Sequence, residues 1–312
     1  EIPKILHGFS EHMKSQKTGY DIHIYDIEGC FPHMPKEAML MAMREAITIL
    51  NNKGKEGVWI PNTRTKSCSW DKGICNGTWI PLEVLGDIYK FAIENCFIKM
   101  PNGTIWKQIL GIPMGDPLSP GICILTCGWM ESEWMENIPL NERQLFRGTR
   151  YMDDILLFVS KKLKTNFIDN FKDNCYWPPL TLEDGTQGTF LETTFRKTLG
   201  DHIVHRLKNQ NEKGNKVWRY HHYHSALDYG TKRGILASCL NKVEKMASNP
   251  SELRISALAK CTEFLRLGYP IGILKFFCGW RARESGLHTW YEVGRRLDSK
   301  VQSPLIPLRR LS

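Results

Sequence analysis

The 312-residue sequence lacks several features that would place it in common protein classes. It has no apolar run of the roughly 20 residues that a membrane-spanning helix needs, no internal repeat and no low-complexity tract. Its ten cysteines form no Cys-x-x-Cys pair, and several lie inside apolar segments, where free thiols pack as small hydrophobic residues. The sequence therefore predicts a folded protein of a reducing, intracellular compartment, with nucleus or organelle left open.

Acidic residues are scarce in the last part of the chain. From Leu191 onward there are 22 Lys and Arg against 10 Asp and Glu, a charge of +12, whereas the first 190 residues carry −3. A basic surface on the same chain as clustered carboxylates is typical of proteins that hold a polyanion by its phosphates. A soluble basic domain with no such partner is the alternative.

Two adjacent acids, Asp153 and Asp154, stand between two apolar, strand-like runs at 145–151 and 155–159. The pattern predicts a β-hairpin whose tip carries both carboxylates. Neighbouring anions beside a core repel each other unless a cation compensates them, and carboxylate oxygens suit Mg²⁺. Asp is also a favoured turn residue, so a plain polar turn is the alternative.

Two further segments carry candidate functional residues. Residues 20–26 alternate as a strand that ends at Asp26, with Phe31 five positions later and a helix expected from about 35 to 50. A loop rich in glycine and proline at 111–121 precedes an apolar helix, and such a loop lets backbone approach a ligand closely. It lacks the Gly-Lys-Ser/Thr of a Walker phosphate loop.

The remaining segments predict a mixture of helices and strands. The expected elements are a long loop or small hairpin insert at about 51–80, a helix at 82–96, a hairpin at 97–108, helices at 122–135 and 161–174, strands at 189–196 and 217–222 around a polar turn at 209–216, and helices at 229–246, 251–267 and 271–280. Residues 1–20 indicate no element.

In this order, Asp26 with Phe31, the 111–121 loop, and Tyr151-Met152-Asp153-Asp154 resemble motifs A, B and C of reverse transcriptases, the last matching their Y-x-D-D box. Finer details are similar to Penelope-like retroelement reverse transcriptases. Met114-Gly115 stands where their motif B has Met-Gly, and Phe190-Leu191-Glu192 resembles their F-L-D box with Glu in place of Asp.

The resemblance implies an α+β fold with a polymerase palm, in which helices pack on an antiparallel sheet, and a mainly helical thumb. The implied domains are a palm with residual fingers at 1–190, which includes the insert, then primer-grip strands at 191–225, and a helical thumb with a C-terminal tail at 226–312. Only 25 residues precede Asp26. The fingers are therefore expected to be largely absent from this chain and to lie on a missing segment or a second chain.

The resemblance also implies an RNA-directed DNA polymerase that uses an RNA template, a DNA primer and deoxynucleoside triphosphates. Two Mg²⁺ ions, with Mn²⁺ as the alternative, would be held by catalytic Asp26, Asp153 and Asp154 and by the backbone carbonyl of Ile27. Other implied contacts are to the nucleotide by Phe31, Met114 and Gly115, to the primer by Phe190 and Leu191, and to nucleic acid by Lys232, Arg233, Lys242 and Lys245.

Two functions outside polymerisation stay open at this point. One is a domesticated or fragmentary relative of reverse transcriptases that binds RNA or scaffolds a ribonucleoprotein. The other is a maturase that assists intron folding, although such a protein would normally show a further basic domain after the thumb.

Overall fold

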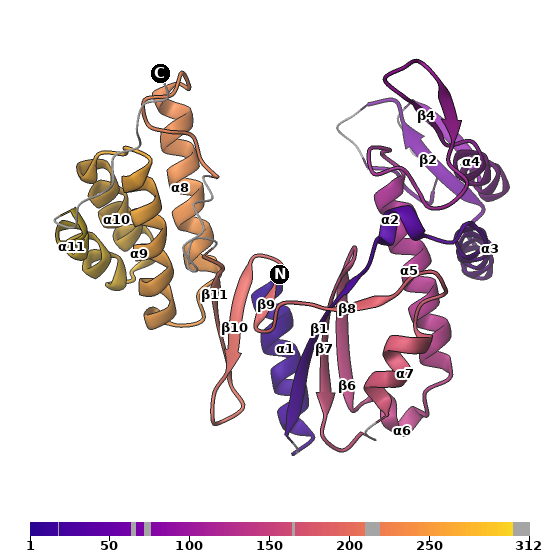
Figure 1. Ribbon diagram of the computed structural model, residues 1–312, viewed down its shortest axis with the longest axis horizontal. Coiled ribbons are helices and arrows are strands. Elements are labelled where there is room, and N and C mark those ends of the chain that lie inside the picture. The colour runs from indigo at the N-terminus through magenta and orange to yellow at the C-terminus, as the bar shows by residue number, and fades with distance from the viewer. Residues whose placement is uncertain (18, 64–66, 72–75, 164–165, 210–218, 302–312) are drawn as a thin grey trace. The chain divides into compact units, whose positions relative to one another are not determined.

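The computed structural model describes residues 1–17, 19–63, 67–71, 76–163, 166–209 and 219–301 (Figure 1). The chain divides into two compact units. Unit 1 comprises Glu1–Ile24 and Thr186–Ser312, and unit 2 comprises Tyr25–Gly185. The division at 190 and 225 that the sequence suggested stays a prediction. None of the helices in the described ranges is both long and apolar enough to cross a membrane.

Unit 2 is organised around a four-stranded sheet with the order β6-β7-β1-β8. β6 (Phe146–Tyr151) pairs antiparallel with β7 (Asp154–Ser160), and the end of β1 (Tyr20–Ile27) pairs antiparallel with β8 (Leu182–Asp184). Five consecutive residues of β7, from Ile155 to Val159, are buried. A strand buried on both faces reads as a continuous apolar run, which explains the sequence of β7.

Helices cover this sheet and share one core with it. The helices that supply most of the core are α3 (Lys36–Asn52), α5 (Ser119–Glu136) and α7 (Phe167–Asn174). The Trp134 ring of α5 lies 5.8 Å from the Phe146 ring of β6 and 5.2 Å from the Phe171 ring of α7, between centroids. Edge-on aromatic packing of this kind fixes how α5 and α7 sit on the sheet.

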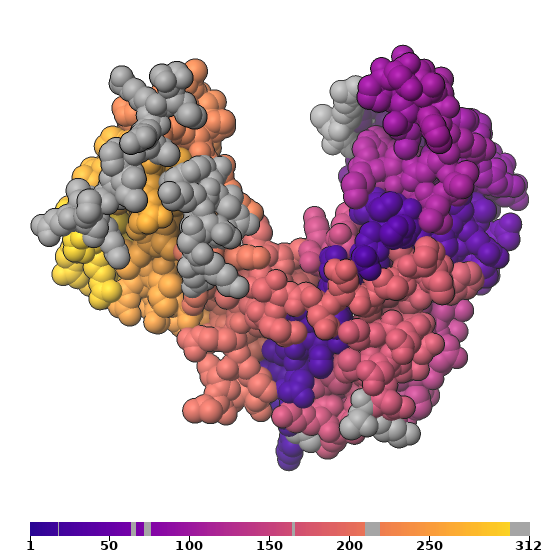
Figure 2. Space-filling view, viewed as in Figure 1, coloured from indigo at the N-terminus to yellow at the C-terminus, as the bar shows by residue number. Residues whose placement is uncertain are grey.

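The other elements of unit 2 form two hairpins and three helices. They are α2 (Cys30–His33), β2 (Gly57–Pro61), β3 (Gly77–Pro81), α4 (Leu82–Glu94), β4 (Phe97–Lys99), β5 (Ile105–Lys107) and α6 (Leu140–Arg143). β2 pairs with β3 and β4 with β5, both antiparallel. The β4–β5 hairpin lies at the end of the unit opposite α6 (Figures 1 and 2), and its Ile105 and Trp106 side chains are exposed.

Unit 1 combines a small sheet with packed helices. The sheet has the order β11-β10-β9, and its members are β9 (Thr189–Phe190), β10 (Thr193–Lys197) and β11 (Ile203–Leu207). The helices are α1 (Ile2–Ser15), α8 (Tyr229–Lys245), α9 (Pro250–Arg266), α10 (Ile271–Ser285) and α11 (Thr289–Val301). Leu240 of α8, Phe264 of α9 and Trp290 of α11 are fully buried in one core.

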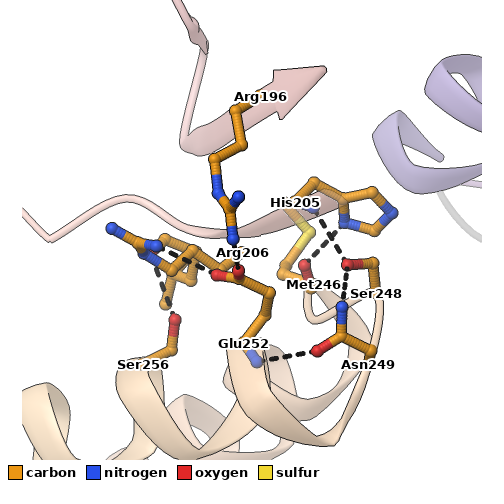
Figure 3. A network of polar contacts seen from close by, with 9 residues as sticks. Arg196, His205, Arg206, Met246, Ser248, Asn249, Glu252 and Ser256 are labelled. Atoms are coloured by element: carbon orange, nitrogen blue, oxygen red, sulfur yellow. Dashed lines mark hydrogen bonds and ion pairs between the residues drawn. The ribbon is translucent and has the colours of Figure 1, made fainter. Parts of the chain in front are cut away.

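A buried carboxylate ties the small sheet to α9 (Figure 3). Glu252, in the first turn of α9, accepts hydrogen bonds of 2.9 Å from Arg196 of β10 and from Arg206 of β11. Asn249 caps the same helix, because its Oδ1 accepts from the Glu252 backbone N–H at 3.0 Å. Burial alone would raise the pKa of the Glu252 carboxyl, but the two arginines outweigh burial and lower it. Glu252 therefore holds two strands and a helix together as an anion.

The predicted α+β class, with helices packed on an antiparallel sheet and a mainly helical C-terminal part, is confirmed. The hairpins expected within 51–80, at 97–108 and around Asp153-Asp154 are confirmed as well. The helices expected at 35–50, 82–96, 122–135, 229–246, 251–267 and 271–280 appear with ends shifted by at most five residues.

Four expectations are corrected. Residues 2–15 form α1, although no element was expected there. Leu6, Ser10 and Met13 form the buried face of this helix, and the polar residues between them concealed the helical period in the sequence. The strand partner of β10 is β11, not 217–222. Of that range, 219–222 is not strand, and 217–218, like most of the expected 209–216 turn, lies outside the described residues. α7 begins at Phe167 instead of 161, and α11 is an additional helix.

Candidate active site

The fold brings the three predicted catalytic acids to one end of the unit 2 sheet. Asp26 is the penultimate residue of β1, and Asp153 and Asp154 occupy the turn and the first position of β7. The backbone N–H of Ile27 donates to the carbonyl of Asp153 at 3.0 Å, which joins the end of β1 directly to the turn. All three acids are partly buried.

Negative charges gather around Asp26 at this end of the sheet. Burial, followed by the negative charges of Asp153, Asp154 and Glu183, raises the pKa of the Asp26 carboxyl. Among the described residues no ion pair engages Asp26 or Asp153. Asp26 and Asp153 thus bring hard carboxylate oxygens to this end of the sheet without an ion pair among the described residues, and such oxygens are the donors that Mg²⁺ prefers.

Glu183 is an acid that the sequence analysis missed. It lies on β8 directly opposite Asp26 in the antiparallel register, so both side chains stand on the same face of the sheet. The signal was absent from the sequence, because β8 has only three residues and no alternation that marks it as a strand.

The 111–121 loop packs against the segment that follows Asp26. Ile112 N donates to Phe31 O at 2.8 Å, and Gly111 N donates to Met34 O at 3.1 Å. Gly111 has a φ of +72°, and a Cβ there would lie 2.4 Å from Phe31 O. Only glycine permits so close an approach. The structure thus brings Phe31 and the loop together, as the three-motif arrangement requires.

The predicted nucleotide-binding residues differ in exposure. Phe31 is partly buried and packs against the core of unit 2, whereas Met114 is 77% exposed and Gly115 is also exposed. The loop is held by Ser119, which is buried and donates its hydroxyl to Pro113 O at 2.5 Å. Met114 and Gly115 are therefore presented to solvent from a loop with a fixed base.

Arg150 connects the acid turn to α5. No role was predicted for it from the sequence. Its guanidinium donates to Met152 O in the turn at 2.9 Å, to Ile124 O of α5 at 3.3 Å and to the Glu131 carboxylate of α5 at 2.5 Å. Glu131 also accepts from the Tyr176 hydroxyl at 2.6 Å. The Arg150 side chain is only 8% exposed. It fixes the turn to α5 through buried, charge-assisted hydrogen bonds.

The predicted primer-grip residues lie in unit 1, at the turn between β9 and β10. Phe190 is buried, and Leu191 is partly buried with a φ of +52°. A non-glycine residue in the left-handed region is strained by about 1–2 kcal/mol. Strain of this kind persists where surrounding structure holds the backbone in place.

The four predicted nucleic-acid contacts lie on α8 with different surroundings. Lys232 is buried and donates to Ser225 O at 2.7 Å, so its ammonium is used inside unit 1. Lys242 is about half exposed and pairs with Glu192. Arg233 and Lys245 are exposed, and Arg233 stacks on the Tyr229 ring, 5.5 Å from its centroid. The surface of α8 thus offers Arg233, Lys242 and Lys245.

No family model matches the chain, and neither does any curated protein. Solved structures similar to it include telomerase from Candida albicans in complex with a TWJ fragment of telomeric RNA (10% identity, 96% of this chain, 55% of that chain, TM-score 0.49) and apo telomerase from Candida Tropicalis (13%, 96%, 50%, 0.46). Another is the Sicinivirus 3Dpol RNA dependent RNA polymerase (12%, 86%, 53%, 0.48).

The chain spans about half the length of the structures it resembles. At these TM-scores the similarity establishes neither a shared fold nor a shared function. The α+β assignment rests on the sheet and the helices of the chain itself.

Proposed function

We propose that the chain is the palm and thumb of an RNA-directed DNA polymerase, a reverse transcriptase of the Penelope-like kind. One observation carries the proposal. Asp26 and the Asp153-Asp154 turn, far apart in sequence, are joined by the hydrogen bond from Ile27 N to Asp153 O, and burial together with the charges of the turn raises the pKa of Asp26. The order and spacing of the three motifs support the same reaction.

The donor set fits two Mg²⁺ ions. The ligands would be Asp26, Asp153, Asp154 and the Ile27 carbonyl. Glu183 would add a further negative charge beside Asp26. The carboxylate oxygens of the three catalytic acids do not all lie within 4.8 Å of one another in the chain without metal. When bound there, the ions would supply Lewis-acid activation of a primer 3′-hydroxyl and charge stabilisation of a pyrophosphate leaving group.

The other residues of unit 2 would position the substrates. Phe31, held by the 111–121 loop, would lie under the sugar of the incoming deoxynucleoside triphosphate and exclude a 2′-hydroxyl. Met114 and Gly115 would contact the base pair, since the loop presents them to solvent. Arg150 would keep the turn in the conformation that ligates metal.

Unit 1 would hold the RNA template and the DNA primer. Phe190 and Leu191 would grip the primer end, and Arg233, Lys242 and Lys245 would contact phosphates without reading sequence.

The test is primer extension on an RNA template with Mg²⁺ and deoxynucleotides. The Asp153→Ala/Asp154→Ala double variant should lose extension. The control is Asp169→Ala/Asp173→Ala, which removes the same charge from exposed positions of α7 in the same unit and should extend normally. Equal extension by both variants would overturn the proposal.

The choice of sugar gives a second readout. Phe31→Ala should raise the use of ribonucleotides relative to deoxynucleotides. A ribonucleotide preference already present in the unchanged chain would assign it to RNA-synthesising polymerases instead.

A second candidate is an RNA-binding or scaffolding protein on the same fold. It is favoured by the exposed basic side chains of α8, which need no catalytic acids. Duplex binding that survives in the double variant, with no extension by the unchanged chain, would identify this function.

A further inference from the structure

Three cysteines of unit 2 converge at a point that the proposed polymerase chemistry does not use. Cys30 is the first residue of α2, and Cys123 and Cys127 lie one turn apart on the same face of α5. All three side chains are at most 2% exposed. The Sγ atoms of Cys30 and Cys123 are 3.5 Å apart, and all three Sγ atoms lie within 4.8 Å of one another.

The spacing of these sulfur atoms matches a coordination triangle. A cation bonded to three sulfurs at about 2.3 Å in one plane separates the sulfurs by about 4.0 Å. The Cys30–Cys123 separation of 3.5 Å is about 0.5 Å shorter than this value, and the other two separations are at most 4.8 Å, so small shifts would close the three sulfurs around an ion. Among the described residues this is the one group of three potential ligands whose atoms come so close together.

The surroundings of the three thiols favour loss of a proton from Cys123. Hydrogen bonds from Cys127 and then Cys30 lower the pKa of the Cys123 thiol, and the Arg150 guanidinium lowers it further, against the effect of burial. The same contacts raise the pKa of Cys127. A cation bound by the three sulfurs would displace their thiol protons to solvent.

We propose that Cys30, Cys123 and Cys127 form a binding site for a soft, thiophilic cation of the Cu(I) class. Three sulfur ligands select such an ion, because structural zinc sites use four ligands. No fourth Cys, His, Asp or Glu joins the group in the described parts of the chain. A single buried cysteine needs no explanation beyond packing, but three sulfurs that meet from two helices form a preorganised ligand set.

An ion at this site would join α2 to α5. Cys30 precedes Phe31 and follows Asp26 by four residues, whereas α5 carries Glu131, the partner of Arg150. Occupancy would therefore stabilise unit 2 behind the acid turn. The site would bind its ion whether or not the chain polymerises.

The experiment is an anaerobic titration of the purified chain with Cu(I), in competition with a chromogenic Cu(I) chelator. One equivalent should bind, and Cys123→Ser and Cys127→Ser should each weaken binding by at least tenfold. Cys175→Ser is the matched control, since Cys175 is a buried thiol of the same unit outside the group, and it should bind like the unchanged chain.

Two further measurements separate loss of ligand from loss of fold. Circular dichroism should show that the serine variants remain folded. Cu(I) should raise the melting temperature of the unchanged chain and of Cys175→Ser, but not that of Cys123→Ser or Cys127→Ser. X-ray absorption at the copper edge should report three sulfur neighbours. Absence of stoichiometric binding, equal binding by all variants, or tighter binding of Zn²⁺ with a fourth light-atom ligand would overturn the proposal.

Discussion

The turn Tyr151–Asp154 in unit 2 and the turn Phe190–Thr193 in unit 1 have the same strand pairing and a positive φ at the same position. They differ in the charged side chains that surround their acids. In each, the flanking residues pair across the hairpin and two residues form the turn. The first turn residue is apolar with a positive φ, +57° at Met152 and +52° at Leu191, and the second is an acid, Asp153 or Glu192. We call them the Met152 turn and the Leu191 turn.

The surroundings of the two acids set the turns apart. Glu192 pairs with Lys242 of α8 and lies 3.6 Å from the Arg219 guanidinium. Asp153 has no ion pair among the described residues, and it is followed by Asp154 and faces Asp26. The acid at the second turn position is thus paired with protein cations in unit 1, whereas in unit 2 it has no ion pair among the described residues. We expect an external cation to compensate the turn whose acid lacks this pairing.

Each hairpin is also anchored by an ion pair between a carboxylate and arginine. The two anchors differ in how many arginines bind the carboxylate. Among the described residues, Glu131 forms an ion pair with Arg150, which also holds Met152 O, whereas Glu252 is shared by Arg196 and Arg206. Arg150→Met should therefore destabilise the chain by about 2 kcal/mol, because it leaves the partly exposed Glu131 carboxylate without its cation and Met152 O without a charged donor. Arg196→Met, which removes a side chain that is 65% exposed, should cost less than about 1 kcal/mol.

Urea denaturation of the two methionine variants measures this difference. Equal destabilisation would mean that the Arg150 contacts are no stronger than the exposed pair at Arg196, and the anchoring role of Arg150 would then be wrong.

The Glu252 anchor should be sensitive to acid. The pKa of Glu252 is lowered in the folded chain, so its charge stabilises the fold above the usual value of 4.5, and this contribution is lost as pH falls through the lower folded-state pKa. Glu252→Gln should cost about 2 kcal/mol at pH 7, and the gap to the unchanged chain should narrow below pH 4.5. A gap that stays constant down to acid unfolding would contradict this ionic role.

Glycine substitutions should relieve strain unequally in the two turns. Leu191→Gly should stabilise the chain by up to about 1 kcal/mol, since glycine adopts a positive φ without strain. Met152→Gly should change stability less, because Met152 also packs against the core of unit 2 and that contact would be lost. Thermal unfolding of both variants checks the order, and a larger gain at Met152 would reverse it.

The sequence predicted the Met152 turn but not the Leu191 turn, because 189–196 was expected as one strand and instead forms β9, a turn and β10. β7 is a continuous apolar run that ends abruptly at two acids, so strand and turn were both visible. The Leu191 turn joins a two-residue strand to β10, whose partner β11 mixes Ile203, His205 and Leu207 with polar residues. Strand pairing of such short segments is set by tertiary packing, including the Glu252 contacts, which spacing along the chain does not show.

Part of the candidate site was also predictable from the sequence, and part was not. Asp26, Asp153 and Asp154 were visible because charged residues at strand ends are unusual beside apolar runs. Glu183 and Arg150 were not, since their roles come from cross-strand register and from a contact with α5. The position of Lys232 inside unit 1 was also invisible, because a lysine on a helix gives no sign of which neighbour its ammonium meets.

The contrast between the two turns leads to one decisive measurement, single-turnover primer extension at saturating Mg²⁺ by Asp153→Asn and Glu192→Gln. Each variant replaces the acid at the second turn position by its amide. Asp153→Asn should reduce the rate by about a thousandfold, because it removes a metal ligand from the Met152 turn. Glu192→Gln should stay within a few-fold of the unchanged chain. Equal effects, or full extension by Asp153→Asn, would contradict the assignment of the Met152 turn as the metal-binding catalytic site.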